Sequence, residues 1–590
     1  MNSNELLRLR KLSNEQFNFY KKRFNTISYF RLVDFMLLLF SLVLFFRHKD
    51  FLWLLTTIIF SLIFIVLIYL HERVGTQKKY YLNRMFVIED YISRINGEWI
   101  YRLEETGNEF NIKNNRMLED LNIVGDASLF SYLNVAVTGG GKKRLFEKLC
   151  NNYIDDEHFR INQESISELS EKFDFSIDFQ AKVKSINQEF KLDHVTESFQ
   201  NPKVIFSHFV VGLIATIGFI ILLILSYTRE INRNYTLIPI VIQILNVFIF
   251  HYTSKSLLST IQKTILSSRT LYNVFSIKEN KKFNSTKLTD INTSIERSLV
   301  GLKKISNLAS WDSFRNNGFT IIITNAIFPL SILILILYDR TIKEYSRVIE
   351  EGIESFEEFE SLLSLSIIGQ VKENVCLPER TNKITINFKN IQHPLLTEKR
   401  AIPNDFYTPQ GINIVTGSNM SGKTSFMKTV GINLVLMNAG TFVNASYFSA
   451  AYFKIFTSMR ITDDITHGIS TFYAELLRVK EAIDYQKENK NMLTLIDEVF
   501  KGTNSNDRIN GAISLINKLN TPKSIVMITT HDFELCDIKT PNLFNYNFSE
   551  YYEGNEIKFT YKINKGRCTT TNAKFLMRLI GIVDNDTGQI

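Results

Sequence analysis

An eight-residue stretch has glycine, lysine and threonine at every fixed position of the phosphate-binding pattern G-x-x-x-x-G-K-[ST]. Its members are Gly417, Ser418, Asn419, Met420, Ser421, Gly422, Lys423 and Thr424. A glycine-rich turn between a strand and a helix points backbone N–H groups at a phosphate, and the helix N-terminus adds positive potential. The pattern predicts that Lys423 contacts the β- and γ-phosphates of ATP, and that the Thr424 hydroxyl is a ligand of Mg²⁺.

Two adjacent carboxylates, Asp497 and Glu498, follow the apolar run Leu493–Ile496. Beside a phosphate-binding loop, the first carboxylate would hold Mg²⁺ and the second would polarise the attacking water. Successive strand residues point to opposite faces, so the two can have different roles only where the strand ends at a ligand. The alternative is a solvated strand end, which would leave the site without a carboxylate for Mg²⁺.

Two further polar sites complete the candidate chemistry. His531 follows the β-branched run Ser524–Thr530, and at the carboxyl end of a third strand it could sense the γ-phosphate. A lone histidine is more often structural, but this placement favours a functional role. Ser470 and Thr471 precede an amphipathic segment and are expected to cap a helix, whose N-terminus is an anion site.

These residues need a sheet to bring them together. Ile412–Thr416 predicts a buried strand before the phosphate loop, and Met427, Val430 and Leu434 recur at helical spacing after it. From Cys376 to Ile590, short strands alternate with helices, which indicates an α/β domain.

The chain has 590 residues, 45% of them hydrophobic, so two or more domains with large cores are expected. The net charge of +8 permits an anionic partner without requiring one. The four cysteines form no C-x-x-C pair, which is typical of reduced structural thiols in a cytosolic protein.

Two pairs of apolar segments predict helical hairpins in a membrane. The first pair is Phe30–Phe46 and Phe51–Leu70, and the second is Val204–Tyr227 and Thr236–Tyr252. The alternative for the first pair is a buried hairpin in a soluble core, which would be unusual for helices without a polar face over this length. The basic N-terminus lacks the early apolar core and cleavage site of a secretory signal.

An even number of crossings keeps the N-terminus and the nucleotide site on the cytosolic side, in agreement with the positive-inside rule. A fifth apolar stretch, Thr320–Tyr338, would put the phosphate loop outside the cell if it crossed. We therefore interpret it as a buried helix. The expected localisation is the cell (inner or plasma) membrane, with the ATPase domain in the cytoplasm.

Two soluble segments carry ambiguous patterns. Gly139-Gly140-Gly141 does not have phosphate-loop spacing, and a flexible turn before a helix Lys142–Cys150 is expected. Glu350–Ser366 carries many acidic residues opposite an apolar stripe, which predicts a solvated helix face.

The fold class expected is a C-terminal α/β P-loop ATPase domain, preceded by a mainly α-helical core with two transmembrane hairpins. The expected divisions are a basic cytoplasmic tail (1–29), a hairpin (30–70), the first part of the helical core (71–203), a second hairpin (204–252), a long-helix lever region (253–375) and the ATPase domain (376–590).

The motifs together resemble the MutS family of DNA mismatch-repair ATPases. The resemblance rests on Thr416–Lys428, Ser470–Glu475, Asp497-Glu498 with Gly502-Thr503, and Thr529–His531. Weaker similarity lies in Asp120–Gly125, Ser128–Phe130 and His393-Pro394-Leu395. The similar segments run from about Arg116 to Gln200 and from Lys255 to Ile582.

This resemblance implies a homodimer of ABC-type ATPase domains with two composite ATP sites. Glu498 would be the catalytic base, Asp497 the Mg²⁺ carboxylate and His531 the switch-strand sensor, with Lys423 serving catalysis as well as binding. Ser470 and Thr471 of one subunit would complete the γ-phosphate site of the other. Asn419, Met420 and Ser425 would line the phosphate site.

The sequence also departs from that family. Mismatch-reading members have an N-terminal domain with an aromatic wedge, whereas this chain has a basic segment and an apolar hairpin there. We therefore expect ATP hydrolysis at a lipid bilayer, with DNA as a partner suggested by kinship. The alternatives are a nucleotide-switched membrane scaffold without a DNA role, and an ABC-type transport protein, although the transporter signature Leu-Ser-Gly-Gly-Gln is missing.

Overall fold

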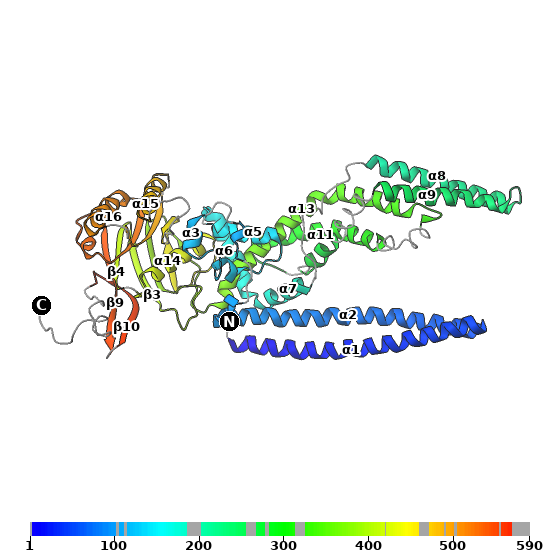
Figure 1. Ribbon diagram of the computed structural model, residues 1–590, viewed down its shortest axis with the longest axis horizontal. Coiled ribbons are helices and arrows are strands. Elements are labelled where there is room, and N and C mark those ends of the chain that lie inside the picture. Colours follow the sequence, from blue (N-terminus) through cyan, green and yellow to red (C-terminus); the bar gives the residue numbers. More distant parts are fainter. Residues whose placement is uncertain are drawn as a thin grey trace.

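The computed structural model describes residues 3–101, 106–110, 115–150, 152–185, 202–254, 267–277, 282–312, 325–418, 420–459, 471–488, 491–500, 504–553 and 556–568. They form an elongated molecule with an α/β domain at one end and two helical hairpins reaching towards the other (Figure 1). The expected order, a helical N-terminal region followed by a C-terminal α/β domain, is confirmed.

The helical region has these elements in chain order. They are α1 (Ser3–His48), α2 (Phe51–Asn96), η1 (Trp99–Tyr101), η2 (Asn108–Phe110), α3 (Arg116–Asp120), α4 (Leu129–Leu133), α5 (Gly139–Leu149), α6 (Asp156–Glu171), α7 (Phe173–Ser185), α8 (Pro202–Tyr227), η3 (Arg233–Thr236), α9 (Leu237–Thr253), α11 (Thr286–Asp312) and α13 (Leu330–Val371).

The first hairpin is longer than its apolar part. Ser28 and Ser41 of α1 lie 2.8 Å and 3.1 Å from His71 and Thr57 of α2, and the Arg10 guanidinium lies 2.6 Å from the Glu89 carboxylate near the open end. The basic segment 1–29 is thus not a separate tail: from Ser3 onward it belongs to α1, because its leucines and aromatic residues pack along α2.

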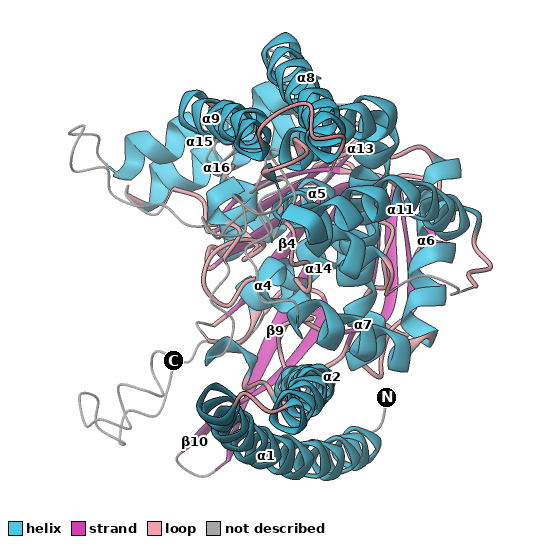
Figure 2. Ribbon diagram, turned by 90° about the vertical axis from the view of Figure 1, so that its right-hand side faces the viewer, coloured by secondary structure: helices cyan, strands magenta, loops and turns pink. Residues whose placement is uncertain are grey.

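Within the described residues, four helices are long and apolar enough to cross a membrane: α1, α2, α8 and the segment Arg233–Thr253 that contains α9. Their outward side chains are unusually exposed for apolar residues; Phe40 is 61% exposed and Ile65 is 61% exposed. Figure 2, an end-on view, places the two hairpins on opposite sides of the helical core.

The fifth apolar stretch lies partly outside the described residues. From Asn325 onward, a short turn leads to Pro329, and α13 begins at Leu330. Ile332, Leu335 and Tyr338 are buried, as expected for a packed helix. Leu337, in the same part of α13, does not follow that expectation, because its side chain is 42% exposed.

The triple glycine begins helix α5 instead of forming a turn before it. Thr138 caps the helix, its hydroxyl accepting the Gly141 N–H at 3.0 Å. A side chain at position 141 would be crowded, since an added Cβ would lie 2.9 Å from Thr138 Oγ1 and 3.0 Å from Glu360 Cβ. Gly141 therefore permits close approach of α5 and α13.

The acidic stripe of α13 is a solvated face only in its first part, where Glu350, Glu351 and Glu354 are exposed. Glu360 is 1% exposed and accepts the Val137 and Thr138 N–H groups at 2.9 Å and 3.2 Å, and also the Thr138 hydroxyl. Glu358 pairs with Lys148 at 2.8 Å and with Lys287. The expectation of a solvated face is therefore wrong for Glu358 and Glu360, because these two carboxylates bind nearby lysines and the positive N-terminal end of α5.

The α/β domain contains two sheets. Its elements are β1 (Glu379–Arg380), β2 (Thr385–Ile391), β3 (Asn404–Pro409), β4 (Gly411–Gly417), α14 (Lys423–Asn438), β5 (Tyr447–Ala450), β6 (Lys454–Ser458), α15 (Thr471–Glu488), β7 (Met492–Asp497), α16 (Ser505–Leu519), β8 (Ser524–Thr530), η6 (Phe533–Asp537), β9 (Leu543–Glu553) and β10 (Glu556–Lys565). The described strands form one sheet ordered β1-β5-β2-β3 and another ordered β10-β9-β4-β8-β7-β6.

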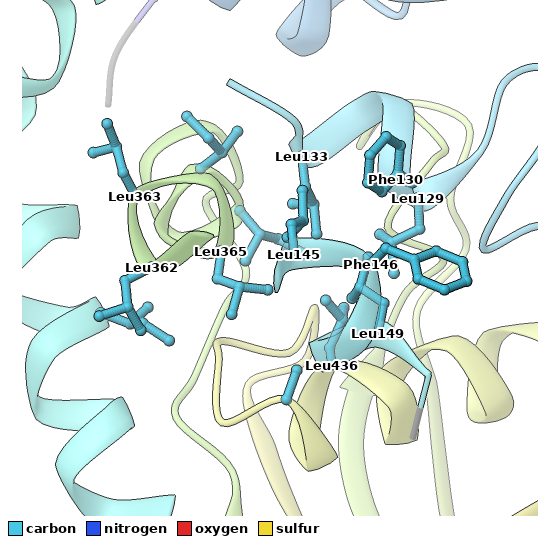
Figure 3. Packing of buried hydrophobic residues seen from close by; sticks show 14 of the residues in the cluster. Leu129, Phe130, Leu133, Leu145, Phe146, Leu149, Leu362, Leu363, Leu365 and Leu436 are labelled. Carbon is cyan, nitrogen blue, oxygen red and sulfur yellow. The ribbon is translucent and has the colours of Figure 1, made fainter. Parts of the chain in front are cut away.

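The helical core and the α/β domain share one apolar core. Figure 3 shows Leu145 and Leu149 of α5 between Leu362 and Leu365 of α13 and Leu436 of α14. The Thr441 hydroxyl also donates to the Leu365 carbonyl at 2.8 Å. Helix α14 begins at the phosphate loop, so the end of α13 is packed directly against the nucleotide domain.

Candidate functional site

The carboxyl ends of three neighbouring parallel strands carry the predicted chemistry. Thr416 of β4 pairs with Thr530 of β8, and Asp497 of β7 pairs with Thr529 of β8. All three strands are almost completely buried, as their continuous β-branched and aliphatic runs predict. The phosphate loop, the two carboxylates and His531 therefore leave the sheet at one edge.

The phosphate loop joins β4 to α14 with left-handed backbone at Gly417 (φ 148°) and Gly422 (φ 108°). A Cβ at Gly417 would lie 2.7 Å from the Phe548 carbonyl, so a side chain is excluded there. The Lys423 ammonium donates to the Gly417 and Ser418 carbonyls at 2.7 Å and 2.8 Å. Burial lowers the pKa of Lys423, although nearby carboxylates act in the opposite direction.

Thr424 and Asp497 lie together where Mg²⁺ is expected. The Thr424 hydroxyl donates to Asp497 Oδ2 at 2.8 Å, and the Thr529 hydroxyl donates to Asp497 Oδ1 at 2.5 Å. These are hard oxygen donors, as Mg²⁺ prefers, and this ion commonly takes one or two protein carboxylates with water and phosphate completing its shell. The described residues contain no cluster of three or more histidine, cysteine, aspartate or glutamate side chains placed to hold a metal ion.

Glu498 and His531 form the second half of the site. His531 Nε2 lies 2.8 Å from Glu498 Oε1, and both side chains are partly exposed. Glu498 has a left-handed backbone (φ 56°), and its N–H donates to the Thr529 hydroxyl at 3.1 Å. A non-glycine residue in this region is uncommon. Thr529 thus orients the Asp497 carboxylate and holds the Glu498 backbone, a role that the sequence pattern did not reveal.

The other predicted site residues are placed less completely. Met420 is 85% exposed at the tip of the loop, Ser421 is buried, and Ser425 lies in the first turn of α14. Helix α15 begins at Thr471, whereas Asn419, Ser470 and the Gly502-Thr503 turn lie outside the described residues.

A pocket of about 180 Å³ adjoins the phosphate loop and was not predicted from the sequence. Gly422 and Ser425 form one wall, with Ile402, Phe548 and Tyr561 among its other lining residues. Tyr561 lies at an irregularity in the β9–β10 pairing and has φ 54°. Such a bulge redirects a side chain, and no local sequence signal marks where it falls.

Two polar contacts that the sequence did not predict lie at the edges of the site. The Ser418 hydroxyl donates to the buried Glu550 carboxylate of β9. On the opposite edge, Arg508 of α16 binds Asp532 with two hydrogen bonds of 2.7 Å and 2.6 Å. Asp532 follows His531, so this bidentate pair fixes the backbone beside the histidine.

His393 also lines the pocket beside Gly422, and its buried position predicts that the protein loses stability in acid. Burial, with Lys428 and Lys372 nearby, lowers its pKa to about 4. The unfolded chain binds a proton at this histidine near pH 6.5, whereas the folded protein binds it only near pH 4. The folded state is therefore destabilised as the pH falls from 6.5 towards 4. Relative to a His393→Asn variant, wild type should lose on the order of 3 kcal/mol over this interval. Chemical denaturation followed by circular dichroism measures the difference.

The control for this experiment is His48→Asn, because His48 is exposed at the α1–α2 turn. It should retain the wild-type pH dependence. An identical pH dependence in wild type and His393→Asn would contradict the burial argument.

Comparison with known proteins agrees with this geometry. Residues 413–582 match the family described as MutS domain V. The DNA mismatch repair protein MutS of Carboxydothermus hydrogenoformans is 27% identical over 252 residues, covering 41% of this chain and 30% of that protein. MutS protein homolog 4 of Homo sapiens is 34% identical over 203 residues, covering 32% and 21%. MutS of Staphylococcus haemolyticus is 30% identical over 236 residues, covering 38% and 26%.

The C-terminal part of the chain is therefore a MutS-family ATPase domain, an ABC-type P-loop domain related to mismatch-repair proteins. The match spans less than a third of the length of these relatives.

Proposed function

We propose that this protein is a membrane-anchored, MutS-like ATPase that binds Mg²⁺-ATP and hydrolyses it. The observation that carries the proposal is the pair of contacts at one sheet edge: Thr424 with Asp497 at 2.8 Å, and Glu498 with His531 at 2.8 Å. Thr424 and Asp497 would hold Mg²⁺, which would supply neutralisation of the phosphate charge when bound.

The remaining residues act as a base and its supports. Glu498 accepts the proton of the attacking water, and the Thr529 hydroxyl fixes the Glu498 backbone. His531 holds Glu498 Oε1, so movement of the β8 end changes the position of the base. When ATP binds, the Lys423 ammonium exchanges its hydrogen bonds to the Gly417 and Ser418 carbonyls for contacts with the phosphates. Hydrogen bonds between two charged groups are stronger than those to a neutral carbonyl.

The pocket beside Gly422 accommodates the nucleotide base. Its volume of about 180 Å³ suits one purine, and the Tyr561 ring offers an aromatic face next to the loop. Asn404 supports this wall, because its side chain donates to the Tyr561 carbonyl at 3.0 Å and accepts the Ile563 N–H at 2.9 Å.

A second copy of the chain completes the site. In this proposal, Ser470 and the α15 N-terminus at Thr471 approach the γ-phosphate bound by the partner, so ATP closes a homodimer. Helix N-termini bind anions through free N–H groups and their dipole. Closure then reaches the helical core through α14 and the adjoining end of α13.

The hairpins anchor the protein in the cell membrane with the ATPase domain in the cytoplasm. Their exposed apolar side chains are costly in water but suit lipid. Both hairpins point away from the ATPase domain in one direction (Figure 1). Positive charge is denser at the ATPase-side ends of the first hairpin than at its turn, as the positive-inside rule requires. The ATPase-side ends carry Lys21, Lys22, Arg23, Arg73, Lys78 and Lys79, whereas the turn carries Arg47 and Lys49.

DNA is the partner suggested by the relatives' names, and a hydrolysis assay tests it together with the enzymatic claim. We expect detergent-purified protein to hydrolyse ATP, and a Lys423→Ala variant to show only background. Each is assayed without DNA, with matched duplex and with mismatched duplex. Stimulation by both duplexes supports DNA coupling without mismatch reading. Equal rates support a nucleotide-switched membrane scaffold, and a wild-type rate no higher than Lys423→Ala overturns the ATPase proposal.

A further inference from the structure

We propose that the turn at Asn325–Pro329 and the first two turns of α13 form a re-entrant membrane element, which enters the bilayer and leaves on the same side. This inference rests on the proposed membrane anchoring. It gives α13 one end within the bilayer and the other end against the ATPase domain.

The contact between this turn and α8 sets its depth. The Thr216 hydroxyl donates to the Ile327 carbonyl at 2.7 Å, and the Phe209 and Phe328 rings lie 6.4 Å apart. At 1.5 Å per residue, Thr216 is about 21 Å from Pro202 and about 16 Å from Tyr227 along α8. If α8 spans a hydrocarbon layer of about 30 Å, the turn lies near its middle.

Gly212 makes that close approach feasible. A Cβ at Gly212 would lie 2.7 Å from the Pro329 side chain and 3.0 Å from Gln243 of α9. By contrast, a Cβ at Gly218, also on α8, would meet its nearest neighbour, Pro239, at an ordinary 3.8 Å. The turn is thus seated in a notch between α8 and α9 that only glycine leaves open.

Several backbone groups of the turn meet the demand that a bilayer makes on irregular structure. Non-helical backbone at membrane depth must be satisfied by the protein. Asn325 accepts the Ser331 N–H at 2.9 Å and donates to the Ser331 hydroxyl at 2.8 Å. Thr216 satisfies the Ile327 carbonyl, and the Leu330 N–H donates to the Phe328 carbonyl at 2.7 Å.

The length and polarity of α13 fit a return to the same surface. After Ser331, the residues up to Leu337 are all apolar, and Asp339-Arg340 follow about 14 Å from the start of the helix. Ile327 is 51% exposed and Leu337 is 42% exposed, so apolar side chains face outward over this part. Such a distance separates the middle of the bilayer from its interface.

Helix α11 shows that the chain does not cross at this point. It packs antiparallel to α13, with Ser294 bound to the Glu351 carbonyl at 3.2 Å and Lys304 bound to Tyr345 at 2.6 Å. The chain before and after the apolar stretch therefore lies at one level. Lys304 and Tyr345, described residues before and after the apolar stretch, lie side by side on the ATPase side of it, which removes the topological conflict posed by a fifth apolar stretch.

The consequence for function is a mechanical link. Helix α13 is continuous for 42 residues, about 63 Å, from Leu330 to Val371. Its distal part holds α5 through Glu360 and contacts the nucleotide domain through Leu365. A shift of the ATPase domain on ATP binding is therefore transmitted as a movement of the membrane-embedded end.

Cysteine labelling of the full chain in sealed vesicles tests the topology, with a membrane-impermeant maleimide added from either side and wild type as the background. Arg229→Cys, at the α8–α9 tip, should react only from the side opposite the ATPase domain. Lys303→Cys and Arg340→Cys should both react from the ATPase side. Ile327→Cys should react from neither side, and a nitroxide at 327 should collide more with dissolved oxygen than with a polar nickel chelate.

The outcomes separate the two proposals. Reaction of Arg229→Cys from the ATPase side overturns the anchoring and the inference together. If Arg229→Cys reacts from the far side, the anchoring stands, and two results would then overturn the re-entrant element alone. One is ready labelling of Ile327→Cys. The other is reaction of Lys303→Cys and Arg340→Cys from opposite sides. Adding Gly212→Val should raise labelling of Ile327→Cys severalfold, whereas Gly218→Val should leave it unchanged; equal effects of the two valines would contradict the notch.

Discussion

Replacing Glu498 with glutamine is expected to reduce the rate of ATP hydrolysis about 10²- to 10⁴-fold, the usual contribution of a general base. Glutamine preserves the size of the side chain but does not accept the proton from water. ATP affinity should change little, because the contacts of Lys423, Thr424 and Asp497 are untouched. A phosphate-release assay and equilibrium binding of a fluorescent ATP analogue measure the two quantities.

The same variant should accumulate an ATP-bound dimer. If hydrolysis opens the dimer, Glu498→Gln will elute as the larger species in size-exclusion chromatography with Mg²⁺-ATP and as the smaller one without it. Glu488→Gln, an exposed change at the end of α15, should behave as wild type. Retention of more than about a tenth of wild-type activity by Glu498→Gln would exclude Glu498 as the base.

Replacing Glu360 with alanine is expected to destabilise the helical core by about 2–4 kcal/mol, because it leaves buried donors without an acceptor. These donors are the N–H groups of Val137 and Thr138 and the Thr138 hydroxyl. Glu354→Ala is the matched control, since Glu354 is exposed on the same helix and its loss should change stability by less than about 0.5 kcal/mol.

The pH dependence of the Glu360 variant gives a second readout. Burial raises the pKa of Glu360 to about 7 from an ordinary 4.5. The stability linked to this raised pKa is present below pH 4.5 and is lost as the pH rises through 7. The destabilisation by Glu360→Ala should therefore be about 1 kcal/mol smaller at pH 8 than at pH 6. An equal or larger loss at pH 8 would show that the carboxylate is held in its ionised form.

Local sequence was sufficient for the features that depend on short-range pattern. A phosphate loop needs glycine and lysine at fixed spacing between a strand and a helix, so Gly417–Thr424 predicts its own conformation. The apolar runs that end at Asp497 and Thr530 predict buried strands, which β7 and β8 match closely. Parallel strands then bring their carboxyl ends to one edge without further information.

Only the tertiary structure decided the features that join distant segments. Glu360 accepts hydrogen bonds from residues more than 200 positions away. The local helical pattern therefore does not distinguish it from a glutamate on a solvated face. Tyr561 reaches the phosphate loop because a bulge turns it there, and strand register places Thr529 against the Asp497 carboxylate and the Glu498 backbone. The packing of Asn325–Tyr338, the described part of the fifth apolar stretch, depended on its contact with α8, because hydropathy measures how apolar a stretch is but not which surface it meets.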